Sequence, residues 1–331
     1  MAKPYPAPAP VRASRAPRPG LRLAVTAGIT VLVLLAFLFL FVRGSFSYSV
    51  GLRATMLGGM TVAAFTQGIG TVVFHTITQN RILTPSIIGF DSMYVLMQTL
   101  MVFVFGGTVI SQTEGIPKLI AQTALMVVFA TLLYRWLFSG RFGSLFLLLL
   151  AGVVIGMAFS SLSGFLQRLL SPTEYDVLSV KLFGRISAVN PEYLPLAFGV
   201  CLVIGVVLWR RRFRLDALLL GRDQATSIGV AYKRELTLML MLIAIMIAFS
   251  TALVGPLTFY GFIVATLAYQ LAGSHQHRFV MPMAFLLGLI TLAGGQFIMQ
   301  HVFYAGGFLT VIIEFLGGIL FIILLLRKGT L

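Results

Sequence analysis

The stretch TQNRILTPSIIGFDS, residues 78–92, interrupts a long apolar part of the chain. Three polar residues, 79–81, follow one apolar run, and Pro85 begins another run that soon meets Asp91. Each run is long enough to cross the roughly 30 Å hydrocarbon core of a bilayer. The break therefore predicts a hairpin at a membrane surface, where the chain leaves the bilayer and re-enters it from Pro85.

After this hairpin the chain must begin a new helix and pack closely against its neighbours as it re-enters the bilayer. Thr84 is expected to cap the helix that Pro85 begins, and Gly89 permits close packing one turn later. Asp91 then lies about two turns into a span, and Glu314 lies inside the last apolar run. A carboxylate at that depth needs a partner or a proton. Two interpretations stay open for both: a polar pathway or proton relay, or contacts with another helix.

The composition of the whole chain supports the membrane interpretation. Of 331 residues, 59% are hydrophobic and 10% are charged, and the mean hydropathy is +1.00. Soluble domains carry about 25% charged residues, so we expect an integral membrane protein. The net charge of +15 then reflects membrane topology, and no nucleic-acid partner is expected. Cys201 is the single cysteine, so we expect no internal disulfide and no cysteine-based metal site.

Ten apolar runs are candidate spans, which predicts an all-α, polytopic membrane protein with about ten transmembrane helices. They cover residues 22–42, 54–77, 86–106, 117–137, 144–166, 193–209, 236–254, 257–272, 280–300 and 308–326. Residues 22–328 are therefore expected to form one transmembrane domain. The basic, Pro/Ala-rich segment 1–21 is expected to be a disordered cytoplasmic tail.

Lys and Arg residues predict the orientation of these spans. With the N-terminus inside, 18 of the 24 lie in cytoplasmic segments and six lie outside. The outer six are Arg43, Arg53, Lys118, Arg168, Lys181 and Arg185. This asymmetry predicts ten spans with both termini in the cytoplasm.

The longest inner segment, Trp209–Glu235, exceeds what a connector between two spans needs. Its arginines within 210–214 could simply anchor a helix end at anionic lipid headgroups. Helix-like runs follow, with breaks at Gly221 and Gly229, which predicts two short helices with a glycine joint. We expect this loop, residues 210–235, to be a docking surface for another protein.

Histidines and short motifs limit the chemistry that the chain can perform. His75 and His301 lie near span ends, where we expect neighbouring groups to satisfy them. His275 and His277 could bind a metal ion, but no acidic or cysteine ligand is near them in sequence, so an exposed interfacial loop is favoured. The chain has no G-x-x-x-x-G-K-[ST] loop and no hydrolase motif. We therefore expect a protein that is not an enzyme and binds no cofactor or metal itself.

Four groups of residues resemble the iron–siderophore permeases of ABC importers, the FecCD family, which includes the vitamin B12 importer permease. The resemblance covers about residues 22–328, and the four groups occur in the family's order. Their members are Gly70, Asn80, Pro85, Ile88, Gly89 and Ser92; Leu220, Gly221, Ala225, Ile228 and Gly229; Gly255, Pro256, Phe259, Gly261, Gly273, Ser274, Arg278, Pro282 and Gly288; and Gly317 with Arg327.

The resemblance implies a vitamin B12 importer permease-like fold and a subunit that works with other chains. It implies a second permease subunit, the same or paralogous, and two cytoplasmic ATPases that bind the ATP. A substrate-binding protein would deliver ferric siderophore across a bacterial inner membrane. The ATPases would contact Leu220, Gly221, Arg222, Asp223, Ala225, Gly229 and Val230. The candidates for the pathway or for helix packing are Asn80, Pro85, Gly89, Asp91, Gly255, Pro256, Gly261 and Glu314.

Several positions depart from the family pattern. Arg81 replaces a frequent proline after Asn80, and Thr84 replaces an aspartate before Pro85. Of two outer arginines that pair with the binding protein in the family, Arg53 is the one present here, so it is the candidate docking residue. These departures resemble a subgroup that serves catecholate siderophores.

An ion-coupled secondary transporter is the main alternative. It would use Asp91 and Glu314 as proton sites and need no ATPase, and inverted repeats would favour it, but no convincing repeat is present. A structural or lipid-interacting membrane protein would leave the loop 210–235 without a purpose.

Overall fold

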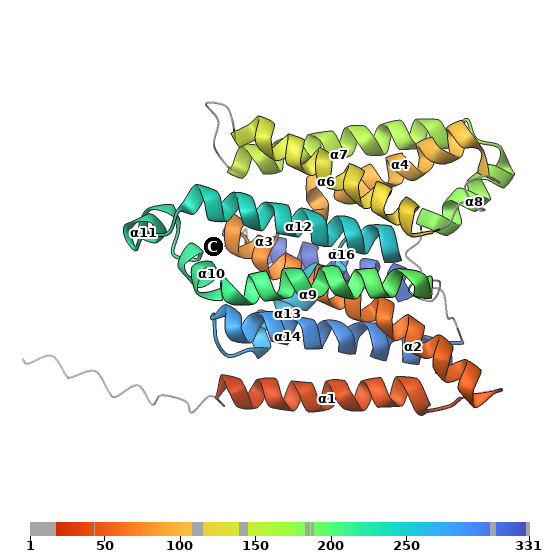
Figure 1. Ribbon diagram of the computed structural model, residues 1–331, viewed down its shortest axis with the longest axis horizontal. Helices are drawn as coiled ribbons and strands as arrows, with labels where there is room; N and C mark the ends of the chain where they lie inside the picture. The colour runs from red at the N-terminus through yellow and green to blue at the C-terminus, as the bar shows by residue number, and fades with distance from the viewer. Residues whose placement is uncertain are drawn as a thin grey trace, which may run out of the picture.

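The computed structural model describes residues 18–42, 44–107, 115–138, 145–182, 186, 189–304 and 309–328, nearly all of them helical (Figure 1). The elements are α1 (Pro19–Phe39), α2 (Phe46–Ala63), η1 (Ala64–Ile69), α3 (Gly70–Thr78), η2 (Pro85–Ile88), α4 (Phe90–Phe105), α6 (Ile116–Phe138), α7 (Leu145–Gln167), α8 (Pro172–Leu182), η4 (Pro191–Tyr193), α9 (Leu194–Arg210), α10 (Arg212–Leu218), α11 (Arg222–Ser227), α12 (Tyr232–Val254), α13 (Tyr260–Leu271), α14 (His277–Leu289), η5 (Ile290–Gly294), α15 (Gly295–His301) and α16 (Leu309–Lys328). The described part contains no strand, and the all-α prediction is confirmed. Most of the predicted tail, residues 1–17, lies outside the described residues, as do Arg43 and Arg185.

Ten apolar helical segments fall on the ten predicted spans. Six are long and apolar enough to cross a membrane, namely Pro19–Phe39, Phe46–Thr78, Leu150–Gln167, Pro191–Arg210, Tyr232–Val254 and His277–His301. Four shorter apolar helices are Phe90–Phe105, Ile116–Leu132, Tyr260–Leu271 and Leu309–Ile323. The chain is therefore an integral membrane protein, and ten crossings stay a prediction.

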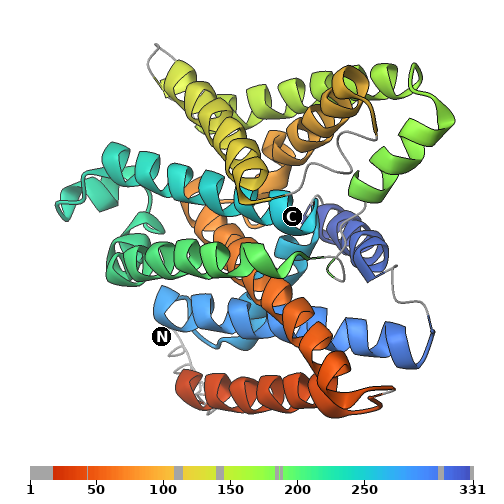
Figure 2. The same ribbon diagram turned by 45° about the vertical axis from the view of Figure 1, so that its right-hand side comes forward.

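The helices form a bundle with two distinct ends. α1 lies along one side, α4, α6 and α7 lie along the opposite side, and α9, α12, α13 and α14 lie between them (Figures 1 and 2). The short helices α10 and α11 lie together at one end, and α8 lies at the other. Helix α8 was not predicted, because charged and polar residues are mixed with scattered apolar ones in the segment between the fifth and sixth predicted spans.

Small residues allow the central helices to approach closely. A Cβ at Gly288 of α14 would lie 2.7 Å from the Tyr260 hydroxyl and 3.0 Å from the Ala64 side chain. A Cβ at Gly261 of α13 would meet Thr71 and the backbone of η1. In a membrane the lipid tails are as apolar as the side chains, so the hydrophobic effect does not drive helices together. Close van der Waals packing between small residues does so instead. The positions of η1, α13 and α14 relative to one another therefore depend on these small residues, which leave no room for larger side chains.

The hairpin at residues 78–92 forms, but it begins differently from the prediction. Gln79 ends α3 in the left-handed region, with φ of 51°, and Pro85 begins the 3₁₀ turn η2 rather than an α-helix. Thr84 occupies the capping position, yet its buried hydroxyl makes no capping hydrogen bond. α4 starts only after Gly89, which has φ of 98°. The predicted cap at Thr84 is therefore wrong.

Gly89 explains why the helix start is delayed. A Cβ at this position would lie 3.1 Å from the Gly156 Cα and 3.2 Å from the Gly152 carbonyl oxygen of α7. Its positive φ also disfavours any L side chain. The close packing predicted at Gly89 is confirmed, and α7 is the partner.

Candidate functional site

The loop predicted as a docking surface forms two short helices at one end of the bundle. α10 ends near Leu218, α11 begins after Gly221, and a second turn follows at Gly229. Both glycines have positive φ, 93° and 87°. The predicted pair of short helices with glycine joints is confirmed, and we call α10, α11 and the turn to Ala231 the α10–α11 module.

Gly221 lies at a crowded joint between α10 and α11. A Cβ there would lie 3.2 Å from the Gln224 Oε1 atom and 3.4 Å from the Gln79 Nε2 atom. Gln79 in turn donates from Nε2 to the Leu218 carbonyl oxygen at 3.4 Å. A side chain at Gly221 would be tight against both amide groups, and the joint connects the module to the end of α3.

Gly229 closes α11 in a different way. The backbone N–H of Val230 donates to the Ala225 carbonyl at 3.0 Å, and that of Gly229 donates to the Thr226 carbonyl at 3.0 Å. This pattern is the glycine-terminated helix end that needs a left-handed residue. A Cβ at Gly229 would meet nothing within 4 Å, so its requirement for glycine is purely conformational.

The predicted contact residues of the module divide by exposure. Ala225 is fully buried and Val230 is half-buried, whereas Arg222 and Asp223 are exposed. Two aliphatic side chains are also open to solvent, Leu220 at 56% and Ile228 at 61%. Exposed aliphatic side chains with charged groups around them are compatible with a protein-docking surface, which has an apolar core and a polar rim.

A buried glutamate fixes the module to α12. Glu235, in the first turn of α12, is 3% exposed and accepts from Arg211 Nη1 at 2.6 and 2.7 Å. Arg214 also donates to the same carboxylate. Charge-assisted contacts of this kind are about twice as strong as neutral hydrogen bonds. Arg211 and Arg214 therefore hold α10 against α12 and do not act simply as lipid anchors.

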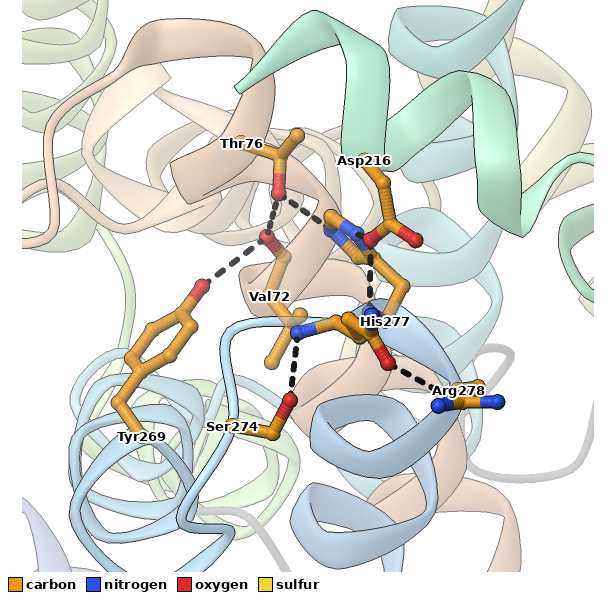
Figure 3. A network of polar contacts seen from close by, with 8 residues as sticks. Val72, Thr76, Asp216, Tyr269, Ser274, His277 and Arg278 are labelled. Carbon is orange, nitrogen blue, oxygen red and sulfur yellow. Dashed lines mark hydrogen bonds and ion pairs between the residues drawn. The ribbon is translucent and has the colours of Figure 1, made fainter. Parts of the chain in front are cut away.

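A second buried contact fixes α10 to α14 and α3 (Figure 3). One oxygen of Asp216 accepts from the His277 backbone N–H at 2.8 Å and lies 2.6 Å from His277 Nδ1. On the other side of the ring, Nε2 lies 2.7 Å from the Thr76 hydroxyl, which donates to the Val72 carbonyl at 2.9 Å. The His277 ring therefore joins Asp216 of α10 to Thr76 of α3.

The placement of His277 corrects a prediction. His277 is 2% exposed rather than part of an exposed interfacial loop, because its ring and backbone both bond to Asp216 as α14 begins. His275 is exposed, as predicted. No group of three metal-ligating side chains occurs in the part of the chain that the structure describes.

Electrostatics at the module follow from these contacts. Partial burial raises the pKa of the Asp216 carboxyl, but the two hydrogen bonds from His277 outweigh it, and the nearby charges of His277 and Arg278 add to them, so the pKa lies below its ordinary value. Beside this pair, the Tyr269 hydroxyl donates to the Val72 carbonyl at 3.4 Å, and the Arg81 guanidinium lies 4.4 Å from the Tyr269 ring centroid. The polar hairpin after α3 thus belongs to the same network.

Two of the interior candidates, Asp91 and Glu314, meet where α4, the break between α12 and α13, and α16 converge. The Thr258 hydroxyl donates to Asp91 Oδ2 at 2.8 Å, and the Glu314 carboxyl of α16 faces the Thr258 backbone. Asp91 Oδ1 is buried and has no hydrogen-bond partner among the described residues, although Ser86 and Thr251 lie near. The structure therefore brings Asp91 and Glu314 close to one Thr258, and neither has an ion pair in the described part.

The other interior candidates shape the surroundings of this cluster. Gly255 ends α12 with φ of 92°, and Pro256 follows it in the turn before α13. Asn80 stabilises the earlier hairpin, because its Oδ1 accepts from the Ile82 backbone N–H at 3.0 Å. These residues act locally, as turn and packing residues.

Arg53, the candidate docking residue, lies at the end opposite the α10–α11 module. Its guanidinium donates to the carbonyls of Phe37 at 2.9 Å and Leu40 at 2.7 Å, and it lies 3.3 Å from His301 Nε2. It therefore caps the last turn of α1. The same contact, with the Phe297 carbonyl 3.0 Å from His301 Nδ1, confirms that neighbouring groups satisfy His301.

Comparison with known proteins identifies the family. The FecCD transport family matches residues 48–327. The chain belongs to this family. The FecCD chain is 42% identical to the petrobactin import system permease protein FatC of Bacillus anthracis over 287 residues, 87% of this chain and 81% of FatC. It is 38% identical to the permease YclO of Bacillus subtilis, also named for petrobactin import, over 86% of this chain and 91% of YclO.

A solved structure has the same fold. A metal-chelate type ABC transporter in an inward-facing conformation superposes with a TM-score of 0.77, 22% identity, and coverage of 93% of this chain and 99% of that chain. The vitamin B12 importer permease-like, all-helical fold expected from the sequence is thus confirmed as a FecCD fold.

Sequence reasoning missed the residues beneath the module. Asp216 and Glu235 are acidic residues within a strongly basic segment, and this contrast could have indicated that they form ion pairs. Thr76 gave no signal, because a threonine in an apolar run is usual.

Proposed function

We propose that this FecCD chain is the permease subunit of an ATP-driven importer that moves ferric siderophores across a bacterial inner membrane. The observation that carries the proposal is the family match over residues 48–327, together with 42% and 38% identity to two permeases named for petrobactin import. A ferric siderophore, and a catecholate one in particular, is therefore the cargo that we propose.

The α10–α11 module is the proposed contact for the ATPases. Leu220, Arg222 and Asp223 offer exposed groups for docking, while Gly221 and Gly229 fix the turns on either side of α11. Ala225, which is buried, and Val230, which is half-buried, would hold α11 and the turn at Gly229 against the rest of the bundle. ATP would be bound and hydrolysed on separate cytoplasmic chains, so this end of the bundle and both termini would face the cytoplasm.

The contacts beneath the module provide a route for force. Movement of α10 would act on α12 through Glu235 and on α14 and α3 through Asp216 and His277. These are direct, charge-assisted contacts, so a push by the ATPases would tilt whole helices rather than distort a loop. Residues 22–328 would act as one transmembrane domain in this step.

A second permease subunit, the same or paralogous, would complete the pathway, and a substrate-binding protein would dock at the Arg53 end. Asn80, Pro85, Gly89, Gly255, Pro256 and Gly261 would serve as helix-packing and turn residues. The family match favours this importer over an ion-coupled secondary transporter. In the importer, Asp91 and Glu314 would be polar groups of the moving interior rather than proton carriers that drive transport.

Copurification and reconstituted uptake test the proposal together. The tagged chain is purified from its native membrane, and its copurifying chains are identified. The complex is then placed in proteoliposomes with the binding protein and a ⁵⁵Fe-loaded catecholate siderophore. We expect an ABC ATPase chain to copurify and uptake to require ATP. Uptake that proceeds without ATP and follows a proton gradient would contradict the proposal and restore the secondary-transporter alternative.

A further inference from the structure

An apolar groove lies on the outer face of α9, away from the module's contacts and the interior cluster. Its volume is about 720 Å³, and α2, η1 and α14 form its other walls. The lining includes Phe65, Phe198, Leu202, Val206 and Phe285, and its main polar groups lie at one end. Leu202 is 69% exposed, so the groove opens to the surroundings of the bundle.

The groove is built into the helix packing. Gly205 lets α9 approach η1, because a Cβ at Gly205 would lie 3.2 Å from the Phe65 ring. Phe65 and Phe285 form an edge-to-face pair with ring centroids 6.3 Å apart, and this pair forms the base of the groove. The side chain of Cys201 is too small to fill the space beside them. An elongated apolar molecule, rather than a protein side chain, matches this shape.

The length of the groove matches one leaflet of a bilayer. From Phe198 to Arg210, α9 rises about 18 Å at 1.5 Å per residue. Half of a hydrocarbon core is about 15 Å. A single acyl chain would therefore run from the middle of the bilayer to the end of the groove.

Cationic and aromatic groups close the groove at the end of α9 nearest the α10–α11 module. Trp209 and Arg210 both line it there. Arg211 and Arg214 are already paired with Glu235, whereas Arg210 makes no ion pair within the described residues. Arg212 stacks over the Trp209 ring at 4.8 Å, and its buried Nε has no hydrogen-bond partner in the described part. These groups leave positive charge and an unused donor beside an apolar channel.

We infer that the groove binds one acyl chain of an anionic phospholipid, with the headgroup phosphate at Arg210 and Arg212. The charge at the end of the groove selects an anionic lipid over a zwitterionic one, and the interfacial Trp209 marks the headgroup level. Such a lipid would rest against the joint between α9 and α10, where the module begins. The inference does not depend on the identity of the transported cargo.

Quenching of Trp209 by brominated lipids tests the site. The full chain, with any chains that copurify, is placed in phosphatidylcholine nanodiscs that contain increasing fractions of acyl-brominated phosphatidylglycerol or acyl-brominated phosphatidylcholine. The chain has two tryptophans, so the signal of Trp209 is the difference between the parent and Trp209→Phe. We expect half-maximal quenching at a roughly fivefold lower mole fraction of the anionic lipid.

Matched variants separate a specific site from the surrounding lipid. Arg210→Gln should remove the preference for the anionic lipid, whereas Lys233→Gln, an exposed basic residue at the start of α12, should keep it. Val206→Phe narrows the groove at an exposed position and should weaken quenching by both lipids. Equal quenching by the two lipids in the parent would overturn the inference and indicate bulk lipid only. Absence of quenching by either lipid would also overturn it, because a protein partner would then cover the groove.

Discussion

Carboxylates that are buried or half-buried occur in two regions of this molecule, and their surroundings differ. At the α10–α11 module, Glu235 has two arginines and Asp216 has a histidine ring and a backbone N–H. In the interior, Asp91 has one hydroxyl donor at 2.8 Å and one oxygen without a partner in the described part of the chain.

The different partners of these carboxylates indicate which of the two regions resists movement. A carboxylate with ionic partners in a half-buried site fixes the elements that carry it, because separation leaves charges unpaired. A carboxylate with a single neutral donor is held more weakly, and its neighbours can rearrange at lower free-energy cost. The module is therefore built as a rigid connection, and the cluster of Asp91, Thr258 and Glu314 is built to tolerate change.

The largest effect is expected from the glycines of the module. Gly221→Leu and Gly229→Leu force a side chain into a left-handed conformation that costs about 1–3 kcal/mol. We expect reconstituted uptake to fall by about tenfold or more, while ATP hydrolysis by the complex continues.

Gly164→Leu is the matched control for these variants. Gly164 lies in α7 with no atom within 4 Å of its Cβ position and no positive φ. Its uptake should stay near that of the parent. Normal uptake by both loop variants would contradict the role of the module in coupling.

The next effect is expected at the bridge between α10 and α12. Glu235→Ala leaves Arg211 and Arg214 without their shared partner, at a cost of about 2 kcal/mol after allowance for their partial exposure. Thermal unfolding of the detergent-solubilised complex should shift downward by several degrees. Glu192→Ala, which removes an exposed acid, should shift it little. Similar midpoints for the two variants would show that the bridge is dispensable.

A smaller effect is expected at the Asp216–His277 pair. Asp216→Asn keeps the shape but removes the charge, at a cost of about 1 kcal/mol. Because the pKa of Asp216 is lowered in the folded state, its stabilisation is complete above the ordinary value near 4 and is lost as pH falls through the folded-state pKa.

A pH series separates this contribution from simple packing. The parent should lose its advantage over Asp216→Asn as the pH of the unfolding measurement is lowered from 7 toward 3. A gap that stays constant over that interval would mean that the charge of Asp216 contributes nothing.

The smallest effect is expected at the interior cluster. Asp91→Asn keeps an acceptor for Thr258 and replaces a carboxyl group that has no ionic partner in the described part of the chain, so the free energy of unfolding should change by no more than about 0.5 kcal/mol. Thermal unfolding beside Asp216→Asn measures the contrast directly. A larger loss for Asp91→Asn than for Asp216→Asn would reverse the comparison between the two regions.

The sequence predicted the arrangement along the chain far better than the contacts across it. Apolar length located the spans, and the left-handed glycines 221 and 229 located the turns of the module, because both signals are local. The bond from Asp216 to His277 joins residues 61 positions apart, and no local pattern encodes it. Thr84 misled the prediction because its capping geometry depends on Gly89 packing against α7, which is a tertiary effect.

The helix from Phe46 to Thr78 carries a π-helical segment, η1, near its middle. A π segment takes up one extra residue relative to an α-helix, and each residue of an α-helix turns the chain by about 100°. The two halves of this rod are therefore out of phase with each other by about a quarter turn. Arg53 at one end and Thr76 near the other can each face their own partners, the end of α1 and the His277 ring, although a continuous α-helix would align only one of them. Deletion of a single residue within 64–69 would bring the halves back into phase and turn one of these contacts away.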